Sequence, residues 1–126
     1  MSVLVVDDSA TMRRIIRNHL RALGLTSVIE VAGADEALTR VRAGGVELVI
    51  ADWAMPGMSG VDLVRAMRAE PASAAVPVLM ITGMGQEEDI RAAADAGVDG
   101  YIVKPFDLPT LQARLQQMLS RAGRNG

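Results

Sequence analysis

The chain has no cysteine, few aromatic residues and no long apolar run; it contains one tryptophan, one tyrosine and one phenylalanine. Without cysteine there can be no disulfide framework, thiolate metal cluster or cysteine nucleophile. So few aromatic rings argue against the stacking platforms that bind single-stranded nucleic acid. No apolar stretch approaches the roughly 20 residues of a membrane span, and the N-terminus lacks the positive region of a signal peptide. We therefore expect a soluble, cytoplasmic protein.

Neither sign of charge dominates, since 13 Lys and Arg face 15 Asp and Glu, for a formal net charge of −2. This balance offers no sequence-wide field to attract nucleic acid or an anionic membrane, so we expect neither as a partner. The length of 126 residues suits one domain with a real hydrophobic core. No linker, repeat or low-complexity tract divides it. We expect a single domain over residues 1–126, with no second domain attached, that acts as a monomer.

Short apolar runs alternate with helical patterns five times along the chain. Most of the runs are continuously apolar, as in parallel strands covered on both faces. The predicted strands are Val3–Val6, Ser27–Val31, Val46–Ala51, Val76–Ile81 and Gly100–Val103. The predicted helices lie around Met12–Leu23, over Ala34–Ala43, Val61–Glu70 and Glu87–Ala96, and around Leu108–Leu119. This alternation predicts an α/β fold, an open, doubly wound parallel sheet of five strands with helices on both faces.

Polar residues follow four of the five predicted strands. In an open α/β sheet, ligands bind beyond the carboxyl ends of the strands, so these residues are expected to meet at one edge. The second strand ends in a plain Val-Ala-Gly, as an edge strand outside the site would. The residues that converge are Asp7 and Asp8, Asp52, Thr82, and Lys104.

Three carboxylates packed together repel one another and need a cation. Oxygen ligands with room for water suit Mg²⁺, and such a site commonly serves phosphate. Lys104 can then pair with a phosphoryl oxygen as a point charge, and the Thr82 hydroxyl can donate to another. Asp52, on the middle strand, is the best-placed nucleophile and would form an acyl phosphate.

Each of these signals is weak alone, and the interpretation depends on the four strand ends together. An acidic pair such as Asp7-Asp8 is usually a helix cap or solvated loop charge, and a lysine is usually on the surface. A phosphatase with an aspartyl nucleophile is the enzyme alternative, although Asp7-Asp8-Ser9 lacks the second acid of the Asp-x-Asp pattern of one such class. No G-x-x-x-x-G-K-[ST] phosphate loop is present.

Four motifs cover most of the chain: V-D-D-S-A-T-M-R-R-I, D-W-x-M-P-x-M-x-G, P-V-L-M-I-T-G and A-G-V-D-G-Y-I-V-K-P-F. With them the chain resembles the receiver domains of two-component response regulators over essentially its whole length, and especially the single-domain chemotaxis members. The resemblance implies a flavodoxin-like (βα)5 fold with strand order 2-1-3-4-5.

The resemblance also implies roles for the acidic residues. Asp52 matches the phosphoacceptor. Asp8, Asp52 and the backbone carbonyl of Ala54 match direct Mg²⁺ ligands, and Asp7 matches the acid that supports the metal largely through water. Chemotaxis members usually carry asparagine where this chain has Ala54. We therefore expect Ala54 and Met84, which border the path of a hydrolytic water, to tune the lifetime of the phosphoryl group.

The remaining site residues belong to the switch and to phosphoryl contact. Thr82 matches the hydroxyl that moves toward the phosphoryl group, and Tyr101 matches the aromatic ring that then swings inward. Lys104 matches the lysine that contacts the phosphoryl group. The resemblance further implies that the Lys104–Pro105 peptide bond is cis.

The function implied is a phosphorylation-activated switch that modifies itself and is not a turnover enzyme. The phosphoryl group would come from a histidine kinase. An output protein, which could be the flagellar motor switch, would bind the face of the fourth helix, fifth strand and fifth helix. Gln86 and Glu87 stand where well-known chemotaxis members carry lysines, so the partner could differ. A relay intermediate of another two-component pathway is the alternative.

Overall fold

The computed structural model of the chain describes residues 1–125, with side chains described as far as Ser120. Five parallel strands form one sheet in the order β2-β1-β3-β4-β5. The strands are β1 (Ser2–Val6), β2 (Ser27–Val31), β3 (Leu48–Ala51), β4 (Val78–Thr82) and β5 (Gly100–Val103). The helices are α1 (Ala10–Ala22), α2 (Ala34–Arg42), α3 (Gly60–Ala69), α4 (Glu87–Ala96) and α5 (Leu108–Asn125). The predicted fold class and strand order are confirmed.

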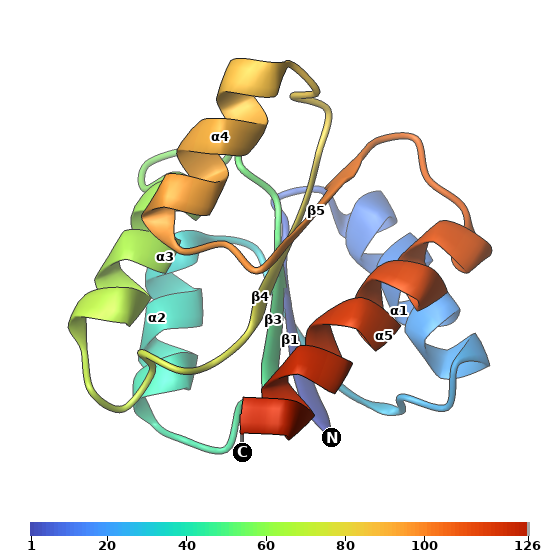
Figure 1. The fold of residues 1–126 in the computed structure, drawn as a ribbon, viewed down its shortest axis with the longest axis horizontal. Helices are drawn as coiled ribbons and strands as arrows, with labels where there is room; N and C mark the ends of the chain where they lie inside the picture. The colour runs from blue at the N-terminus through green and yellow to red at the C-terminus, as the bar shows by residue number, and fades with distance from the viewer. Residues whose placement is uncertain (126) are drawn as a thin grey trace.

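Helices cover both faces of the sheet, with α2, α3 and α4 on one side and α1 and α5 on the other (Figure 1). Successive strand residues point to opposite faces, so the strands feed two cores. Val49 and Met80 pack on the side of α2–α4, whereas Leu48, Ile50 and Leu79 pack on the side of α1 and α5. Every residue of β3 and β4 is buried, which explains the continuous apolar runs in the sequence.

Two strands begin later than the sequence predicts, since Val46 and Val76 lie outside β3 and β4. Pro77 has no N–H to donate to a ladder, so β4 starts only after it. The first N–H of β4, that of Val78, is bound by the Asp99 carboxylate at 2.8 Å. Helix α5 in turn continues beyond the expected apolar stripe.

Serine residues start the two helices that follow the acidic strand ends. The Ser9 hydroxyl accepts a hydrogen bond from the Met12 N–H at 3.2 Å, and the Ser59 hydroxyl accepts one from the Asp62 N–H at 3.1 Å. Such caps satisfy backbone donors that a helix start leaves unpaired. They determine where the loops after β1 and β3 turn back toward the sheet.

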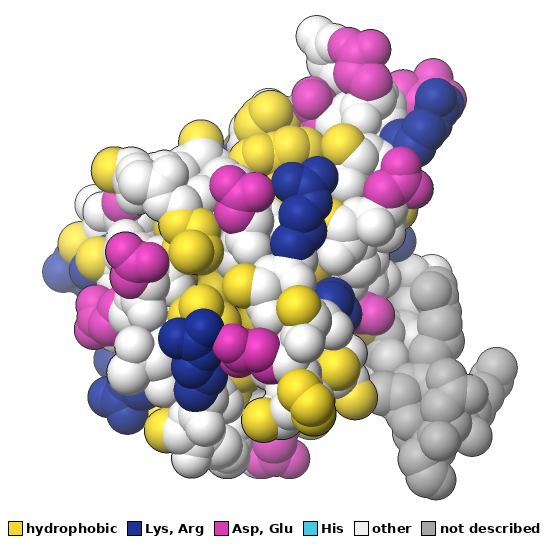
Figure 2. Space-filling model, turned by 90° about the vertical axis from the view of Figure 1, so that its left-hand side faces the viewer, with side chains coloured by type: hydrophobic (Ala, Val, Ile, Leu, Met, Phe, Trp, Pro, Cys, Tyr) yellow, Lys and Arg dark blue, Asp and Glu magenta, His cyan; other side chains and the backbone are white. Residues whose placement is uncertain are grey.

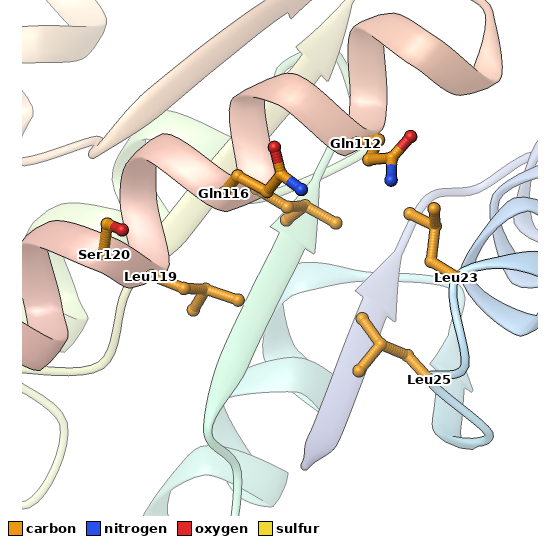
Figure 3. Close-up of a pocket in the computed structure, with 7 residues that line it drawn as sticks. Leu23, Leu25, Gln112, Gln116, Leu119 and Ser120 are labelled. Atoms are coloured by element: carbon orange, nitrogen blue, oxygen red, sulfur yellow. The ribbon is translucent and has the colours of Figure 1, made fainter.

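A groove of about 710 Å³ lies between the loop after α1 and helix α5 (Figure 3). Its apolar wall comes from Leu23, Leu25, Leu115 and Leu119. Because α1 ends there, the groove lies near the amino ends of the strands and away from the acidic residues. Among the described residues, no helix is both long and apolar enough to cross a bilayer.

Candidate functional site

Three carboxylates come together at the carboxyl edge of the sheet. Asp7 and Asp8 directly follow β1, and Asp52 directly follows the neighbouring strand β3. The Asp52 N–H donates to the Val6 carbonyl at 3.0 Å, which holds the two strand ends side by side. One carboxylate oxygen from each of the three residues lies within 4.8 Å of the others. The edge predicted from the sequence is therefore an acidic cluster.

The three acids differ in burial. Asp7 is buried, the Asp52 side chain is 11% exposed, and Asp8 is exposed. Burial raises the pKa of the Asp7 carboxyl above its ordinary value, because desolvation disfavours the charged form. The Ser9 N–H, which donates to Asp7 Oδ1 at 2.9 Å, and the Lys104 ammonium both act against that rise. The cluster thus combines a desolvated acid, Asp7, with an acid that is exposed to water, Asp8.

Lys104, the only lysine in the sequence, reaches into the cluster from the end of β5. Its Nζ lies 3.3 Å from Asp7 Oδ2 and 3.2 Å from Asp52 Oδ2. Its backbone N–H donates to the Thr82 carbonyl at 2.8 Å, and the Lys104–Pro105 peptide bond is cis. One ammonium cannot neutralise three carboxylates, so the oxygen-rich cluster suits a hard divalent cation.

The backbone around Asp52 is tightly folded. Asp52 Oδ1 accepts a hydrogen bond from the Trp53 N–H at 2.7 Å, while Oδ2 faces Lys104. The Gly60 N–H donates to the Trp53 carbonyl at 2.9 Å, and a Cβ at Gly60 would lie only 2.0 Å from the Asp52 carbonyl oxygen. No other residue type fits this close approach. The glycine ends a motif noted in the sequence, but its role there was not predicted.

The loop after β4 connects the threonine with the tyrosine. Thr82 is buried, and its hydroxyl accepts a hydrogen bond from the Met84 N–H at 3.3 Å. The Tyr101 hydroxyl donates to the Met84 carbonyl. Burial, followed by the charges of Asp89 and Asp52, raises the pKa of the Tyr101 phenol. Thr82 and Tyr101 are therefore linked through Met84, whereas Ala54 lies exposed in the loop after Asp52.

Two contacts near the site were not predicted. Arg13 of α1 donates to the Asp7 carbonyl at 2.6 Å. His19 of α1 packs its ring edge-on against Phe106, with ring centroids 5.5 Å apart. Both depend on how α1 packs, so no local pattern could have predicted them.

Comparison with known protein families identifies the family to which this chain belongs. The model of the response regulator receiver domain matches residues 3–116. The acidic cluster, the lysine and the five-stranded sheet define the same class. The chain therefore belongs to the receiver domains of two-component response regulators, which confirms the resemblance seen in the sequence.

Individual relatives narrow the comparison to chemotaxis regulators. The chain is 44% identical to the chemotaxis protein CheY of Pseudomonas aeruginosa, covering 96% of this chain and 98% of the relative. It is 46% identical to CheY-3 of Vibrio cholerae, covering 96% and 93%. Among solved structures, Vibrio cholerae CheY4 superposes with a TM-score of 0.85 at 32% identity, over 93% of this chain and 97% of the other.

Membership in this family defines the class of function. The chain is a phosphorylation-activated switch of two-component signalling, which implies a histidine kinase as phosphodonor and a protein partner for output. No finding supports the phosphatase alternative.

Proposed function

We propose that Asp52 accepts the phosphoryl group and that the chain catalyses this modification of itself. A carboxylate oxygen of Asp52 forms the new bond to phosphorus as the bond to the donor's phosphohistidine nitrogen, or to an acyl oxygen, breaks. The leaving atom keeps the electron pair of the broken bond. The observation that carries the proposal is the placement of Asp52, held by the Trp53 N–H and Lys104 beside two further carboxylates.

We further propose Mg²⁺ as the cation of the cluster. Asp8, Asp52 and the backbone carbonyl of Ala54 would hold it directly, and Asp7 would support it through water. The donor set fits, because the carboxylates outnumber the single ammonium that faces them. When bound, Mg²⁺ neutralises charge that develops on the phosphoryl oxygens. Lys104 orients one of these oxygens in this proposal.

Mass spectrometry tests the assignment. The protein is incubated with Mg²⁺ and acetyl phosphate, and we expect a mass increase of one phosphoryl group that is absent from Asp52→Ala. Asp62→Ala, which removes an exposed acid of α3, is the matched control and should still be labelled. An unchanged mass of the wild-type protein, or a labelled Asp52→Ala variant, would overturn the proposal.

The switch proposed here uses the contacts of the loop after β4. A phosphoryl group on Asp52 gives the Thr82 hydroxyl proton a highly charged acceptor, and movement of the hydroxyl toward it would also displace the oxygen that accepts from the Met84 N–H. Because Tyr101 donates to the carbonyl of the same Met84, a shift of this loop frees or moves the tyrosine. Differential binding of about 1.4 kcal/mol then suffices for a tenfold change in partner affinity.

We propose a role in chemotaxis, the process that the names of the relatives give, and we further propose a cytoplasmic, monomeric protein whose output face is α4, β5 and α5. Acidic side chains gather at the projecting end of the molecule where α4 lies (Figure 2). They include Glu87, Glu88 and Asp89 in the first turn of α4. Ile90 and Tyr101 help to line an adjoining groove of about 230 Å³. This charge favours a partner segment with basic and apolar side chains.

A binding measurement tests the output role. The wild-type chain and Asp52→Ala are each treated with Mg²⁺ and acetyl phosphate and titrated with the motor-switch protein of the same organism. We expect tighter binding only for the wild-type chain. Equal affinities of the treated and untreated wild-type protein would contradict a role at the motor switch and favour the relay alternative.

The residue two positions after Asp52 offers a prediction about phosphoryl lifetime. Ala54 has no amide that could orient a hydrolytic water, so we expect Ala54→Asn to lose its phosphoryl group about tenfold faster, the effect of one well-placed hydrogen bond. The decay of the phosphorylated mass after removal of acetyl phosphate measures this rate. Ala72→Asn, at another exposed alanine, is the control. Equal decay of wild type and Ala54→Asn would contradict the prediction.

A further inference from the structure

Arg13 occupies an unusual place for a cation beside an acidic cluster. Its guanidinium does not pair with the carboxylates of Asp7, Asp8 or Asp52 in any described contact. Instead, one terminal nitrogen donates to the Asp7 backbone carbonyl at 2.6 Å, and Nε lies 3.3 Å from Glu30 Oε1. The Arg13 side chain is only 18% exposed. The planar guanidinium thus connects α1 to the end of β1 and to β2.

The contact between Arg13 and the Asp7 carbonyl lies at the point where the hydrogen bonds of the sheet end. The Asp7 N–H still donates to the Val31 carbonyl of β2 at 3.2 Å. Beyond it the chain leaves the sheet for α1, so the Asp7 carbonyl needs a partner from elsewhere, and Arg13 provides it. The peptide unit held in this way is the one that leads into Asp8.

Asp8 depends on that backbone. Among the described contacts, no hydrogen bond or ion pair holds the Asp8 carboxylate, which is exposed. Its position therefore follows from the turn that runs from Asp7 to Ser9. One end of this turn is tied by the Ser9 N–H to Asp7 Oδ1 at 2.9 Å, and the other by Arg13.

We propose that Arg13 is a positioning residue that holds the Asp7–Asp8 turn and so increases the affinity of the acidic cluster for a divalent cation. This inference rests on the proposed function of the cluster. The charge of Arg13 and the geometry that it imposes on the turn have opposite effects on cation affinity. A nearby positive charge by itself weakens cation binding, whereas a correctly placed carboxylate strengthens it. Lysine at this position keeps the charge but loses the fork that bridges the carbonyl and Glu30.

Arg17 provides a matched control. It lies one turn further along α1 and binds the other oxygen of the same carboxylate, with 2.8 Å between its terminal nitrogen and Glu30 Oε2. No described contact joins Arg17 to Asp7. Arg17→Lys therefore perturbs the same ion-pair group without loosening the turn that carries Asp8.

The experiment compares Mg²⁺ binding by wild type, Arg13→Lys and Arg17→Lys, followed by the fluorescence of Trp53, the only tryptophan. We expect Arg13→Lys to weaken Mg²⁺ binding about fivefold, as for the loss of one ordinary hydrogen bond, and Arg17→Lys to stay within about twofold of wild type. Once Mg²⁺ saturates Arg13→Lys, acetyl phosphate should label it at nearly the wild-type rate. A purely structural role would not separate affinity from rate in this way.

The possible outcomes of this Mg²⁺-binding experiment distinguish the positioning role of Arg13 from the proposed function. Unchanged or tighter Mg²⁺ binding by Arg13→Lys would overturn the positioning role, while phosphorylation of wild-type Asp52 would leave the proposed function intact. Equal weakening by Arg17→Lys would also overturn it, because the loss would then belong to the Glu30 ion pairs. If wild type is labelled at Asp52 but its fluorescence and melting temperature ignore Mg²⁺, this inference and the Mg²⁺ assignment fail, whereas Asp52 stands as the phosphoacceptor. If wild type is neither labelled nor responsive to Mg²⁺, both proposals fail.

Discussion

Two networks of partly buried charge lie at opposite ends of the sheet, and they are built differently. At the amino ends of β4 and β5, a single arginine meets a surplus of acceptors. At the carboxyl ends of β1 and β3, three carboxylates meet a single lysine. Because unpaired charge is costly away from water, the two arrangements have different consequences for stability and for function.

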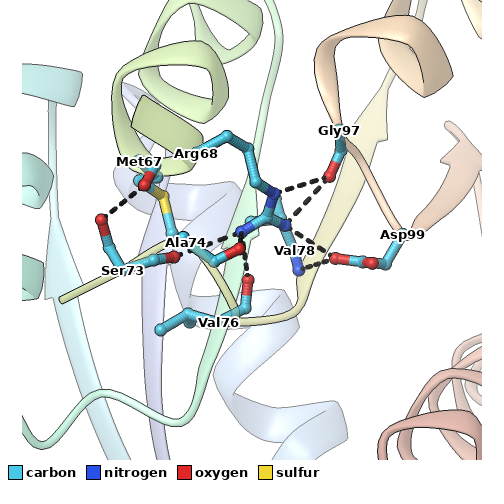
Figure 4. A network of polar contacts seen from close by, with 8 residues as sticks. All are labelled: Met67, Arg68, Ser73, Ala74, Val76, Val78, Gly97 and Asp99. Carbon is cyan, nitrogen blue, oxygen red and sulfur yellow. Dashed lines mark hydrogen bonds and ion pairs between the residues drawn. The ribbon is translucent and has the colours of Figure 1, made fainter. Parts of the chain in front are cut away.

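The first network centres on Arg68 of α3 (Figure 4). Its guanidinium donates to the Gly97 carbonyl at 2.9 and 3.1 Å and lies 2.9 Å from Asp99 Oδ2. It also donates to three carbonyls of the loop before β4, those of Ser73, Ala74 and Val76. Every guanidinium nitrogen has an acceptor, and the one charge has one counter-ion. The network is closed and joins the loops that precede β4 and β5.

The acidic cluster is open by comparison. Asp7 and Asp52 share the Lys104 ammonium, and no described contact compensates Asp8. Repulsion among these carboxylates destabilises the folded chain until a cation binds. A closed network therefore stabilises the fold, whereas an open one costs stability that a bound cation can restore.

The largest expected effect comes from breaking the closed network. Arg68→Met leaves several backbone carbonyls without their donor and Asp99 without its counter-ion, and we expect the free energy of unfolding to fall by about 3 kcal/mol. Urea denaturation measures this. Arg65→Met, which removes a mostly exposed arginine whose one described ion pair is with Asp62, is the control and should cost about 0.5 kcal/mol or less. Equal losses in the two variants would contradict the special role of the Arg68 network.

A somewhat smaller effect should follow from closing the open network with metal. A ligand that binds only the folded chain, at a hundredfold excess over its Kd, raises the free energy of unfolding by about 2.7 kcal/mol. We expect Mg²⁺ to do this for wild type and Arg68→Met, and much less for Asp8→Asn. Urea denaturation in Mg²⁺ and in EDTA makes the comparison. The same gain in Asp8→Asn would contradict the assignment of the cluster.

The smallest expected effect concerns pH and Asp7 in the absence of metal. Burial raises the pKa of Asp7, so the folded chain binds this proton more tightly than the unfolded chain does. For this group, stability therefore falls as pH rises between the unfolded and folded pKa values, and the penalty is fully present above the folded pKa. We expect Asp7→Asn to be more stable than wild type at neutral pH, with the difference shrinking as pH falls through the folded pKa. A difference that grows toward acid pH would be the opposite result.

Much of the fold was predictable because its signals are local. Continuous apolar runs predicted buried parallel strands, and the acids after two of them predicted a shared edge. The errors were at the starts of β3 and β4, where Val46 and Val76 look like strand residues. Pairing of β3 with β1 begins only at Leu48, and β4 begins only after Pro77, which has no N–H to donate to the ladder.

The contacts missed in the sequence are those between segments distant along the chain. Gly60 is needed because its backbone lies against the Asp52 carbonyl, which a list of glycines cannot reveal. Arg13 and Arg68 look alike as helical arginines, yet one supports the acidic cluster and the other joins two loops. The packing of the helices, which sequence spacing does not specify, determines which acceptors each arginine contacts.

The class of fold and the acidic, hydroxyl and amine groups at the strand ends follow from the sequence alone, because strand period and chain order place such residues on one edge. The packing of the folded chain sets the burial and the pairing of these groups. It buried Asp7, left Asp8 open, and brought the ammonium of Lys104 to two carboxylates instead of three. Burial and charge separation depend on distances between segments far apart in the chain, and these distances exist only once the helices have packed on the sheet.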